Sequence, residues 1–342
     1  MDELSPAFSP AWWLPGPHLQ TVWGRLVRPR DAVALRRERL AAPDGEELQL
    51  DHLDGPVGSP RVLILHGLEG SSRSVYVQGL LLGLRARGWS ATVLNFRSCA
   101  WDGPSPRRVP VRRPRLYHSG ETGDLAHVAN ALAARDRKTP LFAIGISLGG
   151  NVLLKWLGET AGNAPVRAAV AISVPFDLAA GARHLKEGVG PLYVAIFLRS
   201  LREKTIDILR RFPDAQQLLD VEAVRRASSF QEFDDAATAP LHGFQGAADY
   251  YLRSSSLSFL PRVAVPTLCL NAADDPFLPP EVLEQARAAA PEQLRVVVTP
   301  RGGHVGFVGS SEGRLRYWAE EVALAWLDRQ GRCAILPREE CA

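Results

Sequence analysis

The chain has 342 residues, of which 46% are hydrophobic and 23% are charged, a mix typical of a packed globular protein that excludes a disordered or fibrous one. Forty basic residues stand against 37 acidic residues, and the resulting formal charge of +3 argues against nucleic acid as a partner and favours a small molecule. This length predicts one large domain that carries an insertion.

The N-terminal region and the cysteines favour a cytoplasmic location. The first ten residues, MDELSPAFSP, lack the basic stretch followed by an apolar stretch that marks a signal peptide. No uninterrupted apolar stretch reaches the roughly 18 to 20 residues of a membrane span. The cysteines are Cys99, Cys269, Cys333 and Cys341. They show no metal-binding spacing, so we expect reduced thiols and no bound metal.

The first 53 residues predict an aromatic lead-in followed by a hairpin. Residues 1–30 contain Trp12, Trp13 and Trp23 with several prolines, and we expect this segment to pack on the body of the protein. Two strand-like runs follow at residues 32–40 and 46–53. The Pro and Asp-Gly between them are turn residues, which predicts an antiparallel hairpin.

From residue 61 short β-branched runs alternate with helical stretches, which is typical of a mostly parallel sheet flanked by helices. The predicted strands are residues 62–65, 91–96, 141–146, 168–174, 266–270 and 294–299. The predicted helices lie near residues 75–87, 122–135, 150–160 and 280–289, with a final helix over about 313–329. The pattern predicts an α/β core formed by residues 31–176 and 263–342.

Residues 177–262 interrupt this alternation. They contain no convincing strand but several helical stretches, including residues 192–212 and 220–227. Ligands of open α/β sheets bind at the carboxyl ends of the strands, where this insertion would lie. We therefore expect a helical lid or cap over the site.

The sharpest local signal is Gly-x-Ser-x-Gly at residues 145–149, which lies between a predicted strand and a predicted helix. A tight strand-to-helix turn exposes Ser147 as a nucleophile, and it leaves no room for side chains at Gly145 and Gly149. The following amide, that of Leu148, lies at the helix N-terminus and can stabilise an oxyanion.

A serine hydroxyl needs a base, and the base needs an orienting acid. The order Ser, acid, His is typical of the α/β-hydrolase fold. Here Asp274 and Asp275 follow one late strand, and His304 follows the next, flanked by glycines. We predict His304 as the base and favour Asp275 over Asp274 as the acid, although spacing alone leaves both open.

A second oxyanion donor is expected in the loop after the first core strand, because two amides must converge on one oxygen. That loop predicts the backbone amide of Leu68, with Gly67 allowing close approach. His66 and Glu69 lie beside it, but two ligands make a weak case for a metal, and none is predicted.

Seven segments together resemble the AB hydrolase superfamily and, within it, the AB hydrolase 4 family of YheT-like hydrolases. They are PHLQTVWG at residues 17–24, HGLEGSS at 66–72, NFR at 95–97, YHSGETGD at 117–124, GISLGGN at 145–151, NAADDPF at 271–277 and GGHVGF at 302–307. The resemblance implies the α/β-hydrolase fold, hydrolysis of carboxylic esters such as acylglycerols, phospholipids or medium-chain acyl esters, acyl transfer in some relatives, and no bound cofactor. Ser98 departs from the glycine usual in this family.

Three segments outside this constellation suggest contacts with lipid or acyl groups. The arginine-rich loop at residues 106–115 could meet anionic headgroups, although a solvated loop is favoured. The apolar run at 192–198, with Tyr193 and Phe197, fits either an acyl-binding wall or the core of the cap. Trp12 and Trp13 could touch a membrane, but packing on the body is favoured.

The sequence thus predicts a serine carboxylesterase that acts through an acyl-enzyme formed on Ser147. One alternative is an acyltransferase that uses the same acyl-enzyme but admits an alcohol. Another is a non-catalytic binding protein that has kept the fold, since one fold hosts many functions.

Overall fold

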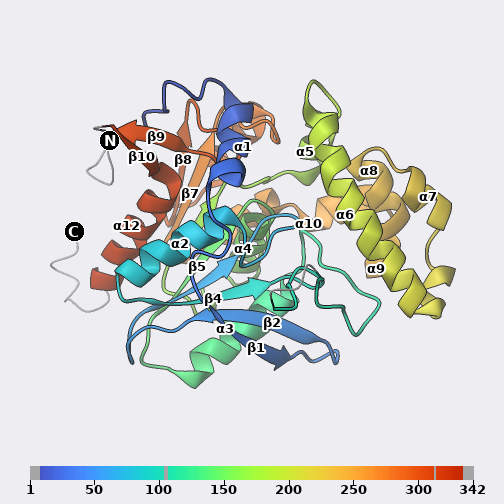
Figure 1. Ribbon diagram of the computed structural model, residues 1–342, viewed down its shortest axis with the longest axis horizontal. Helices are drawn as coiled ribbons and strands as arrows, with labels where there is room; N and C mark the ends of the chain where they lie inside the picture. Colours follow the sequence, from blue (N-terminus) through green and yellow to red (C-terminus); the bar gives the residue numbers. More distant parts are fainter. Residues whose placement is uncertain (1–7, 104–106, 312, 334–342) are drawn as a thin grey trace.

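A computed structural model describes residues 8–103, 107–311 and 313–333, and its centre is an eight-stranded sheet (Figure 1). Its strands are β1 (Arg36–Ala41), β2 (Glu47–Leu53), β3 (Arg61–Leu65), β4 (Ser90–Asn95), β5 (Leu141–Ile146), β6 (Ala169–Ile172), β7 (Thr267–Ala272) and β8 (Leu294–Thr299). The order is β1-β2-β4-β3-β5-β6-β7-β8, and β2 runs antiparallel to both of its neighbours. The strands from β4 to β8 in this order are parallel.

Helices cover both faces of the sheet. The helices around it are α1 (Pro17–Val27), α2 (Val75–Ala86), α3 (Gly123–Arg135), α4 (Leu148–Thr160), α11 (Pro280–Ala289) and α12 (Trp318–Cys333). Buried side chains of α3, α4 and α11 form one apolar core, and those of α2 and α12 form the other. Alternate residues of β3 point to opposite sides, Leu63 into the first core and Ile64 into the second, as strand geometry requires.

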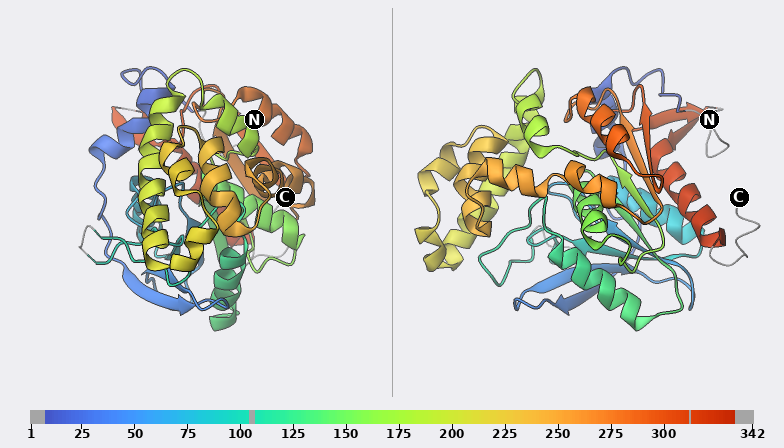
Figure 2. Two further views of the ribbon diagram at one scale, coloured as in Figure 1. Left: turned by 90° about the vertical axis from the view of Figure 1, so that its right-hand side faces the viewer. Right: turned by 180° about the vertical axis from the view of Figure 1, so that it is seen from behind.

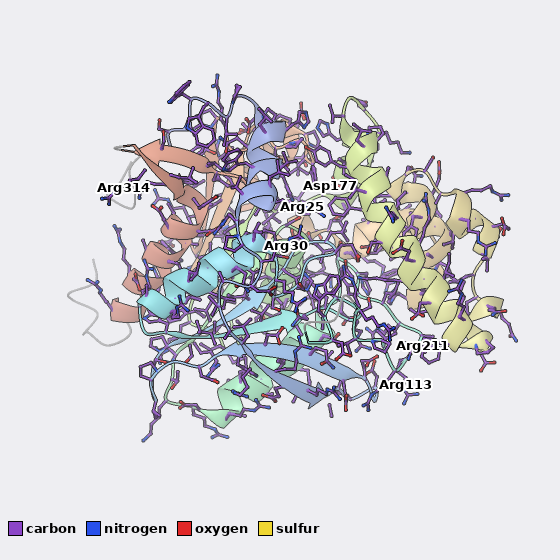
Figure 3. The ribbon with its side chains drawn as sticks, viewed as in Figure 1. Arg25, Arg30, Arg113, Asp177, Arg211 and Arg314 are labelled. Atoms are coloured by element: carbon purple, nitrogen blue, oxygen red, sulfur yellow. The ribbon has the colours of Figure 1, made fainter. Side chains whose placement is uncertain are left out.

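Between β6 and β7 the fully described residues 178–262 form helices and turns without a strand. These helices are α5 (Leu178–His184), α6 (Gly190–Arg211), α7 (Val221–Arg226), α8 (Phe230–Phe233), α9 (Ala239–His242) and α10 (Ala247–Ser254), with short 3-10 segments at Pro213–Gln217 and Ser256–Arg262 and a π-helical turn at Asp234–Thr238. Most of them gather at one end of the molecule, away from α12 (Figure 2). Asp177 lies at the start of α5 (Figure 3) and caps that helix by accepting a hydrogen bond from the amide of Ala180.

The predicted α/β-hydrolase fold is confirmed, since every predicted parallel strand is present and the sheet is flanked by helices. The predicted final helix is present, but its predicted start near residue 313 was wrong. Residues Arg314–Tyr317 form β10, which pairs with β9 (Val308–Ser311) in a separate hairpin, and α12 begins only at Trp318. The pairing with β9 overrides the helical pattern of this stretch.

The aromatic lead-in contains a helix that the sequence pattern did not predict. Helix α1 begins with Pro17 in its first turn, a position where proline removes no helical hydrogen bond. Trp13 and Trp23 are partly buried and pack edge to face with ring centroids 4.8 Å apart, whereas Trp12 is 86% exposed. Trp13 and Trp23 belong to a small apolar cluster with Ala11, Leu14, Val308 and Tyr317.

Two further predictions concern membranes and thiols. Among the described residues, no helix has the length and apolar character needed to cross a membrane. Cys99 and Cys269 are buried free thiols. Cys341 and the side chain of Cys333 lie outside the described residues.

Candidate active site

The turn from β5 into α4 holds Ser147 in a conformation that non-glycine residues rarely adopt, with φ 53° and ψ −121°. Its two glycines leave no space for a side chain. A Cβ on Gly149 would lie 2.5 Å from the backbone oxygens of Leu65 and His66, and a Cβ on Gly145 would lie 2.5 Å from the oxygen of Gly149. The close packing of strand against helix thus explains the Gly-x-Ser-x-Gly spacing.

The structure brings Ser147, His304 and Asp275 together in one hydrogen-bonded chain. The Nε2 atom of His304 lies 2.8 Å from the Oγ of Ser147, and its Nδ1 lies 2.8 Å from the Oδ2 of Asp275. The side chains of His304 and Asp275 are only 10% and 2% exposed. Asp275 is oriented in turn by the amide of Phe277, which donates to its Oδ1 at 2.9 Å.

Asp274 points elsewhere, and its Oδ1 accepts a hydrogen bond from the amide of Gly303 at 2.9 Å. Burial raises the pKa of this carboxyl, and the charge of Asp275 acts in the same direction. Asp274 therefore fixes the loop that carries His304, whereas Asp275 contacts the imidazole itself.

Three residues that sequence reasoning did not select also hold the His304 loop. The Oγ1 of Thr21 in α1 accepts from the amide of His304 at 2.9 Å, and the Oγ of Ser173 accepts from the amide of Val305 at 2.9 Å. The ring of Phe277 stacks on the imidazole at a centroid distance of 4.2 Å. Thr21 and Phe277 both lie within segments that carry the family resemblance, which was the available signal.

The two predicted oxyanion amides flank the serine. Leu148 opens α4, and a Cβ on Gly67 would lie 3.1 Å from the Cβ of Ser147, so the loop that carries Leu68 runs beside the nucleophile. Within the described part of the chain, neither the Leu68 amide nor the Leu148 amide donates to another protein group. The Oη of Tyr76 fixes this loop by accepting from the amide of Gly67 at 2.9 Å.

His66 and Glu69 both make contacts within the protein. The Nε2 of His66 accepts from the amide of Phe96 at 3.0 Å, and its Nδ1 donates to the oxygen of Gly67 at 2.8 Å, which fixes a neutral tautomer. Burial lowers the pKa of His66 to about 4. The Glu69 carboxylate accepts from the Nζ of Lys204 at 2.6 Å. In the described ranges no cluster of three or more His, Cys, Asp or Glu residues is arranged to hold a metal.

The insertion meets the site through aromatic side chains. Tyr193 of α6 packs edge to face on Phe277 at 4.9 Å between centroids, and Phe197 approaches the same ring at 6.1 Å. The Oη of Tyr193 also lies 3.1 Å from the Nδ1 of His18 in α1. An aromatic wall formed by Phe277, Tyr193 and Phe197 therefore lies next to His304.

In the arginine-rich loop Arg107, Arg112 and Arg113 are exposed, whereas Arg108 and Arg115 are partly buried. Arg112 pairs with Glu47, Arg115 pairs with Glu121, and Arg108 packs over the ring of Trp101. Residue 106, where the predicted loop begins, lies outside the described residues. Ser98, in the segment between β4 and this loop, has φ 64°, a conformation that glycine adopts without strain.

A family model described as alpha/beta hydrolase fold matches residues 60–310, which is most of the chain. With the elbow and the contact chain of Ser147, His304 and Asp275, this match shows that the chain belongs to the α/β-hydrolase family.

Within that family the chain is YheT-like. It is 36% identical over 315 residues to YheT of Escherichia coli (strain K12), a proposed esterase, covering 91% of this chain and 89% of that protein. It is 28% identical over 313 residues to phospholipase ABHD3 of Homo sapiens, covering 89% of this chain and 74% of that protein. An esterase from Exiguobacterium antarcticum shares the fold, with a TM-score of 0.52 at 15% identity, over 86% of this chain and all of that one. The predicted family is therefore confirmed.

Proposed function

We propose that this protein is a serine hydrolase that cleaves carboxylic esters through an acyl-enzyme. The observation that carries the proposal is the contact chain from Ser147 through His304 to Asp275 at a strand-to-helix elbow. The nucleophile Ser147 contacts the base His304, and the base contacts the orienting acid Asp275, as this chemistry requires. The esterase and phospholipase names of its relatives agree with this reaction.

The reaction would begin when the Oγ of Ser147 attacks the ester carbonyl while the Nε2 of His304 takes its proton. The amides of Leu68 and Leu148 would donate to the resulting oxyanion. His304 would then protonate the leaving alcohol, which leaves an acyl group on Ser147. Water attacks that acyl group as His304 takes its proton, and the carboxylic acid departs with the serine restored. Asp275 would hold the imidazole in the required tautomer and stabilise its charged form.

The substrate class proposed is an acyl ester whose chain is short to medium or lipid-like. The aromatic wall of Phe277, Tyr193 and Phe197 supports an apolar acyl group beside the reacting carbonyl.

We further propose that residues 177–262 act as the cap of this site, that residues 1–30 pack on the core, and that residues 31–176 and 263–342 form the hydrolase body. The free thiols of Cys99 and Cys269 support a reducing, cytoplasmic setting.

The proposal is tested by hydrolysis of p-nitrophenyl esters with acyl chains of two to sixteen carbons. We expect turnover by the natural chain and a loss of about 10⁴-fold or more in kcat for Ser147→Ala. The acyl chain length that is hydrolysed fastest would indicate the size of the acyl-binding site. A Ser147→Ala protein that keeps the full rate would overturn the assignment. Added ethanol separates hydrolysis from acyl transfer, because only a transferase converts it efficiently to the ethyl ester.

A further inference from the structure

One face of helix α6 contacts both sides of the candidate site. Tyr193, Phe197, Ser200 and Lys204 are spaced by four, three and four residues, so they share one side of the helix. The first two contact Phe277, which stacks on His304. The last two contact Glu69. The same helix therefore reaches the base on one side and the oxyanion loop on the other.

Glu69 directly follows Leu68, and its backbone has φ 57°, in the left-handed region that side chains rarely adopt. Its amide donates to the Oη of Tyr117 at 2.7 Å, and the same Oη donates back to the Glu69 carboxylate at 2.8 Å. Tyr117 is itself buried and stacks on Phe96 at 5.4 Å. This reciprocal pair fixes both the side chain and the backbone of Glu69.

The hydrogen bonds that the Glu69 carboxylate accepts from Lys204 and Ser200 come from the insertion, and Arg108 of the arginine-rich loop adds a longer ion pair. The Nζ of Lys204 donates to it at 2.6 Å, the hydroxyl of Ser200 donates to its other oxygen, and Arg108 lies 3.7 Å away. The side chains of Glu69 and Lys204 are only 8% and 9% exposed. Burial opposes ionisation of Glu69, but the charge and the hydrogen bond of Lys204 prevail and hold the pKa of this carboxyl below its usual value.

A buried ion pair of this kind constrains geometry more than it adds stability. If either partner is removed, the other remains as an uncompensated charge, and the local structure moves to hydrate it. This movement would shift the peptide bond between Leu68 and Glu69, and with it the neighbouring backbone amide of Leu68. The Leu68 side chain packs against the same buried cluster of cap residues as Tyr193 and Phe277, and this cluster includes Val194 and Leu198 of α6.

We infer that Glu69 is a positioning residue for the oxyanion amide of Leu68, and that Lys204 and Ser200 of α6 hold it in place. The oxyanion site is then complete only when α6 is seated on the core, so the cap takes part in transition-state stabilisation as well as in enclosing the acyl chain. This inference rests on the proposed function, since it assigns a role within that reaction.

The test compares Glu69→Gln, Lys204→Met and the double variant, in the full chain. Each is assayed for kcat and KM on one p-nitrophenyl ester and for inhibition by a trifluoromethyl ketone of the same chain length, which forms an oxyanion when Ser147 adds to it. We expect kcat to fall by about 10-fold to 100-fold and the ketone to bind more weakly by a similar factor, with KM within about threefold. The double variant should recover part of the loss, because neither Glu69 nor Lys204 is then left as a buried charge without its partner.

Two further variants separate this role from simple anchoring of the cap. Leu219→Ala removes a buried side chain from a different cluster of the cap, which includes Ile208, and should lower the melting temperature with a much smaller change in kcat. Ser200→Ala deletes only a hydroxyl, so it should fold normally and still lower kcat by about fivefold.

The inference is overturned if the folded Glu69 and Ser200 variants keep the natural kcat and ketone affinity, or if Leu219→Ala reproduces their losses at equal loss of stability. Failure of the proposed function gives a different result, because the unmodified chain would then neither hydrolyse esters nor bind the ketone.

Discussion

The core and the cap hold the candidate site by different means. In the core, backbone geometry positions Ser147: a strained turn and two glycines bring α4 against β5 so closely that a single Cβ would clash. In the cap, side chains of α6 reach across to Phe277 and Glu69. Small changes in the core should therefore abolish the site, whereas changes in the cap should retune it.

The largest effect is expected where the core orients the base. Asp275→Asn removes the carboxylate that contacts the Nδ1 of His304, and we expect kcat to fall by about 10⁴-fold because the imidazole loses its required tautomer. Asp274→Asn keeps an oxygen that can accept from Gly303 and should lose far less. Steady-state hydrolysis of a p-nitrophenyl ester measures kcat for both variants. Equal losses in the two variants would contradict the distinct roles assigned to the two aspartates.

An added Cβ should destabilise the fold more at Gly149 in the core than at Gly243 in the cap. Gly149→Ala places a Cβ against backbone oxygens on both β3 and its following loop, and we expect it to lower the free energy of unfolding by about 3 kcal/mol. Gly243 in the cap has φ 71° and open space around it, so Gly243→Ala should cost about 1 kcal/mol from backbone strain alone. Urea unfolding of the two variants gives both values. A reversed order would show that the elbow relaxes more readily than its contacts indicate.

The smallest effect is a pH dependence within the cap. Burial raises the pKa of Asp234 to about 7, although hydrogen bonds from Thr238 and Tyr251 act against this shift. A raised pKa favours the neutral carboxyl in the folded chain, so its stability contribution is full below about pH 4 and is lost as pH rises through 7. Asn has no such titration. The stability of Asp234→Asn relative to the natural chain should therefore increase between pH 4 and 7.5.

Thermal unfolding at fixed ionic strength across this range measures that difference. A constant difference between the two proteins would mean that Asp234 titrates normally in the folded cap. Activity should follow the natural chain throughout, because Asp234 contacts neither the His304 loop nor Glu69 in the described structure.

The parts of the site that depend on local pattern could be predicted from the sequence. Ser147 and its glycines follow from the order strand, turn and helix, and His304 follows from its position after a late strand. Spacing could not separate Asp274 from Asp275, because adjacent residues of one turn point in different directions. Only the contacts with Gly303 and with the imidazole distinguish them.

The contacts that join distant segments could not be predicted in this way. Thr21 reaches His304 across 283 positions, and Lys204 reaches Glu69 across 135. No periodicity within one segment records such a pairing. The error over residues 313–317 has the same origin, because pairing with Val308–Ser311 decides the structure of that stretch.

The most direct test of the central claim is labelling of the unmodified chain and of Ser147→Ala with a fluorophosphonate, read by intact mass. We expect one adduct on the unmodified chain and none on the variant, because the hydrogen bonds through His304 to Asp275 activate a single serine. An unlabelled natural chain, or a variant that still gains the adduct, would contradict the assignment of Ser147 as the nucleophile.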